Sequence, residues 1–325
     1  MLMYKHEKFL RYNKNMKKFI LTLLMTFIIA PVCFASDNYI AYADSKSAKN
    51  AKQQTQIMEK EVRNLFKRLA SYTNNFDEEN LKKAYSDNYL NSDGFDKTMY
   101  FDLVNKTWKL YPDIKYTMNI DRINIVGNTA IVTVNENATA TTTEKVDETE
   151  IKGYLKSYSD SVYYLEKVGD NWIITSDSII SEKTTLTYGE ANEITMDLIV
   201  PQLVPAGKEY TASLKITVPD KKMLTIASIG QERITYPHIN AQEVFRKLPK
   251  NGILERIFKA NNDNYNEYTV GSAGITRAKV TSNKEIKLVV TGLGYVITRT
   301  NIIPTKDFSK VKENGKKETT AKLVE

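Results

Sequence analysis

The feature that most constrains the fold is a change of pattern close to Pro112. From Thr55 to Pro112, apolar residues recur at the three- and four-residue spacing of amphipathic helices. From Lys115 to Pro304, Ile, Val, Thr and Tyr dominate and alternate with polar residues, which is typical of half-buried strands. We therefore expect an α+β protein in which the helices precede the strands.

Three helices are predicted in the first part of the chain. The first follows an apolar stripe that includes Val62, Phe66 and Leu69. The second begins after Asp77, whose carboxylate suits an N-cap. The third covers residues 97–110 and ends where a proline prevents its continuation.

Four long strands are predicted next, at residues 115–126, 129–140, 149–167 and 172–187. Gly127 with Asn128, and Gly169 with Asp170, are turn signals for antiparallel hairpins. Three helices followed by such strands describe an α+β domain in which a curved antiparallel sheet wraps a helix.

The second half of the chain is predicted to be an all-β, sandwich-like domain. Its predicted strands follow one another closely, and segments that contain proline separate several of them. One short helix is expected at residues 240–247. The predicted strands cover residues 194–204, 210–218, 223–229, 232–236, 253–259, 267–270, 275–280 and 285–303. Residues 204–212 faintly resemble the entry to immunoglobulin-like modules of bacterial envelope proteins.

Residues 16–35 predict export. Lys17 and Lys18 form a cationic start, an apolar run of about 12 residues follows, and small residues precede a cut after Ala35. Residues 1–35 are therefore predicted to be a signal peptide. In an alternative interpretation translation begins at Met16, because the cationic start is already complete at Lys17 and Lys18. A cut after Ala43 is the second alternative. A lipoprotein is disfavoured because Val32 precedes the cysteine. The mature chain would be periplasmic or secreted.

Removing this segment changes the chemistry that the chain can support. The sequence has 46 basic and 39 acidic residues, and residues 1–35 hold six and one of them, so the mature net charge is +2. Such a balance disfavours nucleic-acid binding. The cut also removes Cys33 and His6, which leaves His238 as the single histidine. We therefore expect no thiol catalysis, no metal site and no cofactor.

Two further segments complete the predicted organisation. Residues 36–54 form a polar leader, either a tether or the frayed start of the first helix. Residues 305–325 form a Lys-rich tail with too few apolar residues to order it. The two domains are expected at residues 55–188 and 189–304.

A family resemblance is carried by residues 76–81 and 85–89, by Asp93 with Gly94, by Trp108, and by residues 123–130 and 163–172. Together they resemble the nuclear transport factor two-like superfamily, which includes ketosteroid isomerase-like and polyketide cyclase-like proteins. The resemblance covers about residues 55–187. It implies a cone-shaped barrel with a pocket at its open end, used by some members for catalysis and by others for binding.

The resemblance also implies a candidate catalytic base. Asp93 occupies the loop in which isomerases of this superfamily place their carboxylate. The expected oxyanion partners are missing, because the matching part of the first helix has no tyrosine and the late strand has Ser161 or Val162 in place of an acid. Residues 91–94 also form a good turn sequence, which is the interpretation we favour for Asp93.

Aromatic side chains supply the candidate ligand-binding residues. Tyrosine and tryptophan combine an apolar ring with a polar group, which suits a pocket for an apolar molecule. Packing of the sheet is the alternative role for each of them. The candidates are Tyr85, Tyr89, Tyr100, Trp108, Tyr154 and Tyr163.

From these observations we expect an exported, non-catalytic binding or envelope-assembly protein. Its cone domain would bind a small apolar ligand or a protein partner, and self-association through edge strands is a further alternative. The competing hypothesis is an isomerase- or cyclase-type enzyme with Asp93 as general base.

Overall fold

The computed structural model describes residues 45–145, 151–219, 223–238, 243–280 and 286–304. The predicted export segment, residues 36–44 of the leader and the tail 305–325 lie outside this part. Within it, no helix is both long enough and apolar enough to cross a membrane.

The three predicted helices are present as α2 (Ser45–Asn74), α3 (Glu78–Lys83) and α4 (Lys97–Leu110). Helix α2 extends back to Ser45, so the end of the polar leader is the start of the first helix. The Asp77 carboxylate accepts a hydrogen bond from the backbone N–H of Asn80, which confirms its N-cap role. Asp96 caps α4 in the same way, through the N–H of Met99.

The next four strands also agree with the predicted pattern. They are β1 (Lys115–Val126), β2 (Thr129–Lys145), β3 (Lys152–Val168) and β4 (Asn171–Gly189), and each pairs antiparallel with the next. Gly127 and Gly169 adopt φ angles of +58° and +61° in two of the connecting turns. Glycine suits these turns because other L-residues rarely adopt positive φ.

The second half contains longer strands than predicted. Residues 267–280 form one strand, and most of residues 223–236 form another, because pairing on both sides bridges the expected breaks. The predicted helix at residues 240–247 is wrong in its described part, since Arg246 and Lys247 pair with Ala227 and Ile226 of a neighbouring strand. Tertiary pairing here overrides local preference. The elements are η1 (Glu190–Asn192), β5 (Thr195–Ile199), β6 (Leu203–Pro205), β7 (Glu209–Thr217), β8 (Leu224–Arg233), β9 (Arg246–Lys247), β10 (Ile253–Lys259), β11 (Glu267–Val280) and β12 (Ile286–Ile303).

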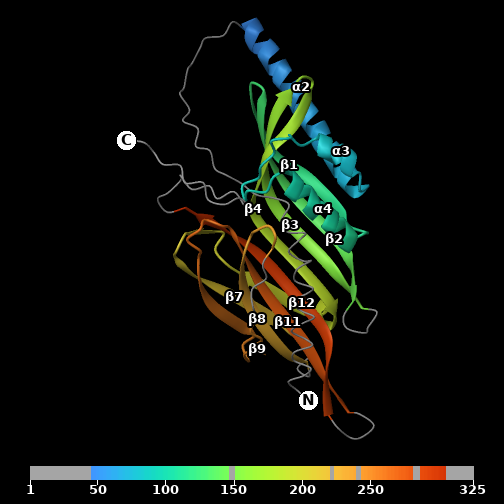
Figure 1. Cartoon of the computed structure of the whole chain (residues 1–325), viewed down its shortest axis with the longest axis vertical. Coiled ribbons are helices and arrows are strands. Elements are labelled where there is room, and N and C mark those ends of the chain that lie inside the picture. The colour runs from blue at the N-terminus through green and yellow to red at the C-terminus, as the bar shows by residue number, and fades with distance from the viewer. Residues whose placement is uncertain (1–44, 146–150, 220–222, 239–242, 281–285, 305–325) are drawn as a thin grey trace.

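One nine-stranded sheet runs through most of the molecule (Figure 1). Its order is β1-β2-β3-β4-β12-β11-β8-β9, with β6 pairing parallel to β12. Strand β12 lies between β4 and β11, where Gly294 pairs with Thr187 on one side and with Ala273 on the other. The two parts of the chain on either side of residue 189 therefore share one sheet. Their division into two domains stays a prediction.

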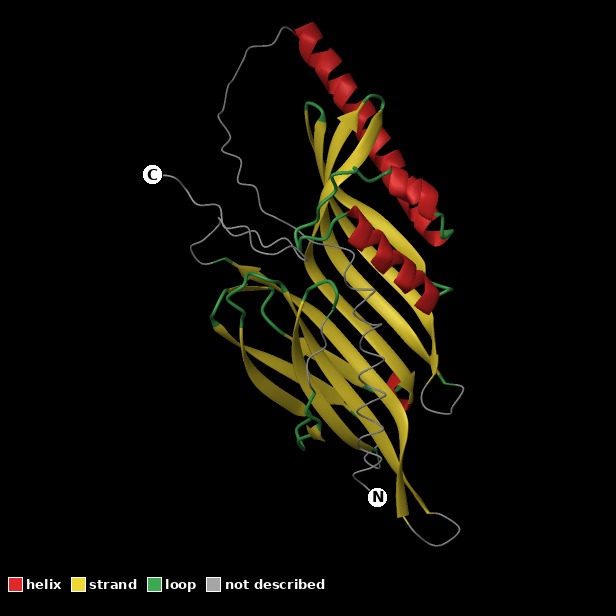
Figure 2. Cartoon of the chain, in the orientation of Figure 1, coloured by secondary structure: helices red, strands yellow, loops and turns green. Residues whose placement is uncertain are grey.

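The large sheet is covered on opposite faces at its two ends. The helices lie against β1–β4 on one face (Figure 2), and β10-β7-β5 form a second sheet packed near the other end. Strand β12 serves both cores, because Tyr295 and Ile297 belong to the helix-side cluster and Val296 to the cluster shared with the small sheet. The structure thus confirms the α+β class, with a helix-covered antiparallel sheet followed by a β-rich part.

The first prediction concerns the junction of β4, β12 and η1, where Gly292 lies against backbone. A Cβ atom at this position would lie 2.5 Å from the Ala191 nitrogen. We expect Gly292→Ala to lower the free energy of unfolding by about 1–3 kcal/mol, because backbone cannot move aside cheaply. Urea denaturation would measure it.

Gly169→Ala is the matched control, since its positive φ is strained but nothing lies within 4 Å of the added atom. Its cost should be about 1 kcal/mol from the backbone alone. An effect of Gly292→Ala no larger than that of the control would contradict the close-packing argument.

Candidate functional site

A row of buried polar side chains crosses the helix-covered face of the large sheet. Glu136 on β2, Ser159 on β3 and Glu182 on β4 lie opposite one another in register. Lys183 pairs with Thr298, which places Glu182 beside Arg299 on β12. The row continues through Tyr268 on β11 and Glu232 on β8. We call Glu136, Ser159, Glu182, Arg299, Tyr268 and Glu232 the polar row; all six are buried.

Arg299 is the central cation of this row. Its Nη2 lies 3.1 Å from Oδ1 of Asp93, and the two side chains are 0% and 1% exposed. The Asn266 amide donates to the same Asp93 oxygen at 2.7 Å. The Nε of Arg299 donates to Asn301 at 2.6 Å. This ion pair joins the last described strand to the loop between α3 and α4.

Glu136 and Glu182, two of the three glutamates of the row, are held towards the protonated state. Burial raises the pKa of Glu182 to about 8, although Arg299 and the Tyr268 hydroxyl oppose this rise. Burial also raises the pKa of Glu136 well above its usual range, against the effect of the Tyr163 hydroxyl. Tyr268 donates to Glu182 at 3.1 Å, and Tyr163 donates to Glu136 at 2.9 Å. Both glutamates therefore carry their protons at neutral pH for much of the time.

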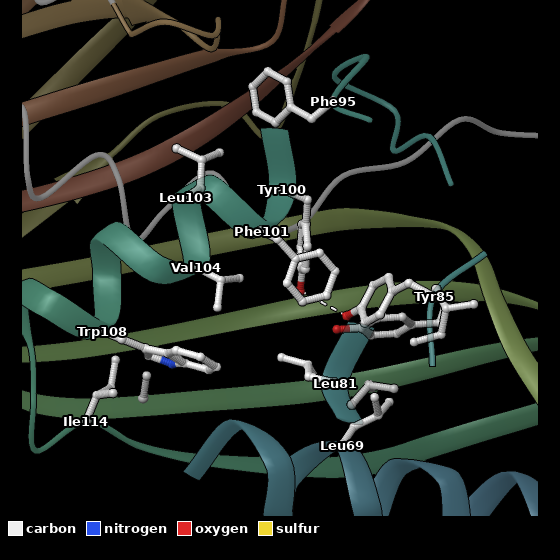
Figure 3. Packing of buried hydrophobic residues seen from close by; sticks show 14 of the residues in the cluster. Leu69, Leu81, Tyr85, Phe95, Tyr100, Phe101, Leu103, Val104, Trp108 and Ile114 are labelled. Carbon is white, nitrogen blue, oxygen red and sulfur yellow. Dashed lines mark hydrogen bonds between the residues drawn. The ribbon is translucent and has the colours of Figure 1, made fainter. Parts of the chain in front are cut away.

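Three predicted tyrosines form one cluster beside the row. The hydroxyls of Tyr85 and Tyr100 lie 2.9 Å apart, as the dashed line in Figure 3 shows. The Tyr89 ring lies 5.1 Å from that of Tyr85, and its hydroxyl donates to Asp177 at 2.6 Å. Burial raises the pKa of all three hydroxyls, so they act as neutral hydrogen-bonding groups.

One cavity in the described part of the chain lies under the helices and is mostly apolar. It has a volume of about 20 Å³, which is room for about one water molecule. We call it the aromatic cavity. Its lining residues come from α2, α3, α4 and β1 and the residues that follow α3: Leu69, Thr73, Leu81, Tyr85, Tyr100, Val104, Trp108, Tyr116 and Met118. Figure 3 shows Tyr85, Tyr100, Val104 and Trp108 converging there.

The second cavity, also about 20 Å³, is polar. Tyr116 lines both cavities and so stands between them. The other lining residues include Glu136 and Glu182 of the polar row, and we call this space the acidic cavity. The remaining lining residues are Asn137, Ala138, Ser157 and Ser159.

The predicted site residues are brought together only in part. Tyr85, Tyr100 and Trp108 line the aromatic cavity. Tyr89 and Tyr163 are buried next to it and bond to Asp177 and Glu136. Tyr154 lies apart, 41% exposed, with the Lys156 amine over its ring.

Asp93 lines neither cavity. The turn at residues 91–94 is confirmed, because the Asn91 side chain accepts from the N–H groups of Asp93 and Phe95 and Gly94 has φ of +80°. Its carboxylate is engaged by Arg299 and Asn266. A role as general base stays a prediction, and the geometry gives it no support.

The polar row was not predicted from the sequence, although the alternation of residues along its strands contains a signal for it. Glu136 follows Val132 and Val134 in the same alternation, which places a carboxyl on the inward face. Arg299 follows Tyr295 and Ile297 in the same way. An acid or arginine in phase with buried apolar residues would have been the clue.

Asp177 could not have been found by that argument. Register shifts lie on either side of it, between Asp160 and Ser161 and between Tyr164 and Leu165. Each shift inserts one extra residue into β4, so the set of alternate residues that faces inward changes at each of the two shifts. In the described ranges, no group of three or more His, Cys, Asp or Glu side chains could hold a metal ion.

No family model and no curated protein matches this chain. Similar solved structures include a candidate scytalone dehydratase from Novosphingobium aromaticivorans, which is 13% identical in sequence. The match covers 39% of this chain and 86% of the dehydratase chain, with a TM-score of 0.34. A conserved protein from Planctomyces limnophilus shares 16% identity over 38% and 94% of the two chains, with a TM-score of 0.33. A type 3 hexachlorocyclohexane dehydrochlorinase from Novosphingobium barchaimii shares 13% identity over 39% and 87%, with a TM-score of 0.32. The helix and strand order of residues 45–189 agrees with the nuclear transport factor two-like resemblance.

The second prediction concerns the ion pair between Arg299 and Asp93. We expect Arg299→Met to lower the free energy of unfolding by about 3–5 kcal/mol, because Asp93 would remain buried without its cation. Asp93→Asn removes that charge, so the double variant should lose less than the sum of the single variants. A urea denaturation cycle measures this coupling.

Lys183→Met is the control for this cycle, since its pair with Asp197 is 43% and 47% exposed. Its loss should change stability by no more than about 1 kcal/mol. Additive effects of the Arg299 and Asp93 substitutions would refute the coupling.

The third prediction concerns pH. The Glu182 pKa is about 8 in the folded protein against an ordinary value of 4.5, so folding retains a proton that the unfolded chain releases. Raising the pH from about 4.5 to 8 therefore lowers the free energy of unfolding. Gln cannot release such a proton, so we expect the free energy of unfolding of Glu182→Gln to fall less steeply with pH. Urea unfolding from pH 5 to 8 measures the slope, with exposed Glu166→Gln as control.

Glu136 acts with the same sign, so part of the slope should remain in Glu182→Gln. If the free energy of unfolding of Glu182→Gln changes with pH as steeply as that of the unsubstituted protein, the raised Glu182 pKa is ruled out.

Proposed function

We propose that this chain is an exported, non-catalytic binding protein whose aromatic cavity receives a small apolar ligand. The export part of the proposal rests on the pattern of residues 16–35. The binding part rests on the cavity beneath the helices. An envelope protein partner, or self-association, stays a prediction from the sequence.

One observation carries the binding proposal. Trp108 lines the aromatic cavity, and its indole Nε1–H is buried with no hydrogen-bond partner among the described residues. Leaving a buried donor unpaired costs about 1–3 kcal/mol, which a ligand with one acceptor atom would recover. Trp172 provides the contrast, because its indole donates to Glu61 at 3.1 Å. The ligand class is therefore an apolar molecule with a single acceptor oxygen.

The rest of the lining supports binding without catalysis. The hydroxyls of Tyr85 and Tyr100 bond to each other, and Asp93 is engaged by Arg299 away from the cavity. A general base must come within hydrogen-bond reach of the proton it removes. None of these groups presents a free carboxylate to the aromatic cavity.

A ligand larger than one water molecule must displace part of the lining. Met118 is half-buried, and its flexible thioether side chain can adopt several shapes at low cost. We therefore expect an open state in which Met118 moves and the buried rings of Tyr85 and Tyr100 remain in place.

The fourth prediction tests this site through the indole N–H resonance of Trp108. Trp172→Phe leaves Trp108 as the one tryptophan of the sequence, so its signal is unambiguous. Cyclohexanone, which has an acceptor oxygen, should move this resonance downfield and saturate. Methylenecyclohexane, which has a similar shape and no oxygen, should not produce a downfield shift.

Val104→Phe is designed to fill the cavity and should abolish the saturable shift, because Val104 is part of the lining. Tyr154→Phe is the control, since this residue is exposed and lines neither cavity. A shift that persists in Val104→Phe would mean that the probe binds elsewhere.

A further inference from the structure

The backbone is strained at one turn beside the aromatic cavity. Helix α2 ends at Asn74, and Phe76 follows with a φ of +57°. This left-handed conformation is costly for a bulky L-residue, and glycine or asparagine usually occupies it at the end of a helix. Among the described residues, the other non-glycine residue with positive φ is Asn264, a residue type that tolerates this conformation. Local preference therefore does not explain why residue 76 is a phenylalanine.

Hydrogen bonds on both sides hold Phe76 in this conformation. The backbone N–H of Asp77 donates to the carbonyl of Tyr72 at 2.9 Å, and the N–H of Phe76 donates to that of Thr73 at 3.3 Å. This pair of bonds is a common helix ending in which the residue after the cap is left-handed. The Asp77 side chain also caps α3. The turn is thus fixed at both ends, and it determines where the Phe76 side chain can lie.

The Phe76 ring packs against Trp108, which lines the aromatic cavity. The two ring centroids lie 5.3 Å apart, and the ring planes meet at 75°. Phe76 is 36% exposed, whereas Trp108 is 8% exposed. Phe76 is not one of the described residues that line the cavity. Its ring therefore forms an outer layer between solvent and the indole of Trp108.

The helices around Phe76 are held by bonds that do not involve its side chain. The Asn74 amide donates to the carbonyl of Tyr116 at 2.9 Å and accepts from its N–H at 2.8 Å. Asn105 of α4 donates to Glu78 of α3 at 2.9 Å. Rotation of the Phe76 side chain breaks none of these bonds, and rotamers of a partly exposed residue interchange readily. The ring can therefore move while the turn and the helices remain in place.

We propose that the Phe76 ring is the gate of the aromatic cavity: it rotates away from Trp108 to admit solvent or an apolar ligand, and it returns to cover the indole. This inference rests on the proposed function, because it gives that binding site its route of entry.

Two observations fit a gate better than simple packing. Backbone strain is often retained at functional positions, and here it keeps an aromatic ring over the indole. The buried Nε1–H of Trp108, which has no hydrogen-bond partner among the described residues, is the group that an open gate would expose. A gate of this kind changes the rates at which a ligand enters and leaves, and it leaves the contacts of the bound ligand unchanged.

The fifth prediction is measured first on the full chain without ligand. In the Trp172→Phe background, hydrogen–deuterium exchange of the Trp108 indole N–H reports opening of the cavity. Phe76→Asn removes the ring and places a residue that tolerates positive φ there, so this exchange should become about tenfold faster. Phe76→Tyr keeps the ring and should leave the exchange rate unchanged. Slow backbone amides of β3, which is paired on both sides, report unfolding of the whole protein.

Cyclohexanone then tests the gate with a ligand probe. Because Phe76 covers the cavity without lining it, Phe76→Asn should speed association and dissociation by the same factor. The dissociation constant should therefore not change. Relaxation dispersion of the Trp108 indole resonance, together with a titration, measures both rates.

Three results would overturn the gate. The first is an indole exchange rate that Phe76→Asn leaves unchanged. The second is an equal acceleration of the β3 amides, since the whole protein would then be opening. The third is a higher dissociation constant at an unchanged association rate, which would make Phe76 part of the binding surface. A failure of cyclohexanone to bind the protein that retains Phe76 would instead contradict the proposed function, and faster indole exchange in Phe76→Asn would still support the gate.

Discussion

The ion pair between Arg299 and Asp93 is the interaction on which the arrangement of this molecule depends. Arg299 lies on the last described strand and Asp93 in a turn 206 residues earlier, and both side chains are fully buried. A buried guanidinium without a counter-charge would be costly, so the turn and the strand must remain together. The pair thereby holds β12 at its place between β4 and β11 and closes the interior of the cone against the loop that follows α3.

The same cation explains why the sheet can hold a row of acids. Arg299 opposes the rise of the Glu182 pKa, while Glu136 lies further along the row and remains shifted by burial. Around this row the interior divides into an aromatic space and an acidic space, with Tyr116 between them. A protein that used its interior only for stability would gain more from apolar residues at these positions. The buried indole N–H of Trp108, which borders the aromatic space and has no hydrogen-bond partner among the described residues, supports the proposed binding function.

Much of the first half of the fold was predictable because its signals are local. The stripe of Val62, Phe66 and Leu69 placed a helix, and all three side chains are buried. Asp77 and Gly127 marked an N-cap and a turn through their own backbone preferences. Local preference was a poorer guide in the second half, where Arg246 and Lys247 joined a strand edge instead of a helix. For the site, the rings of Tyr85, Tyr100 and Trp108 were identified, and Glu136, Glu182 and Arg299 were not.

The sequence by itself determined the α+β class, the order of helices and strands to residue 189, and a set of aromatic residues inside the cone. These properties follow from periodicity, capping and turn chemistry, which act over a few residues. Only the tertiary structure decided that β12 inserts beside β4, that Arg299 neutralises Asp93, and that Glu136 and Glu182 share one cavity. Such contacts join residues far apart in the chain through strand register and burial, and no local pattern encodes which distant strand becomes the neighbour.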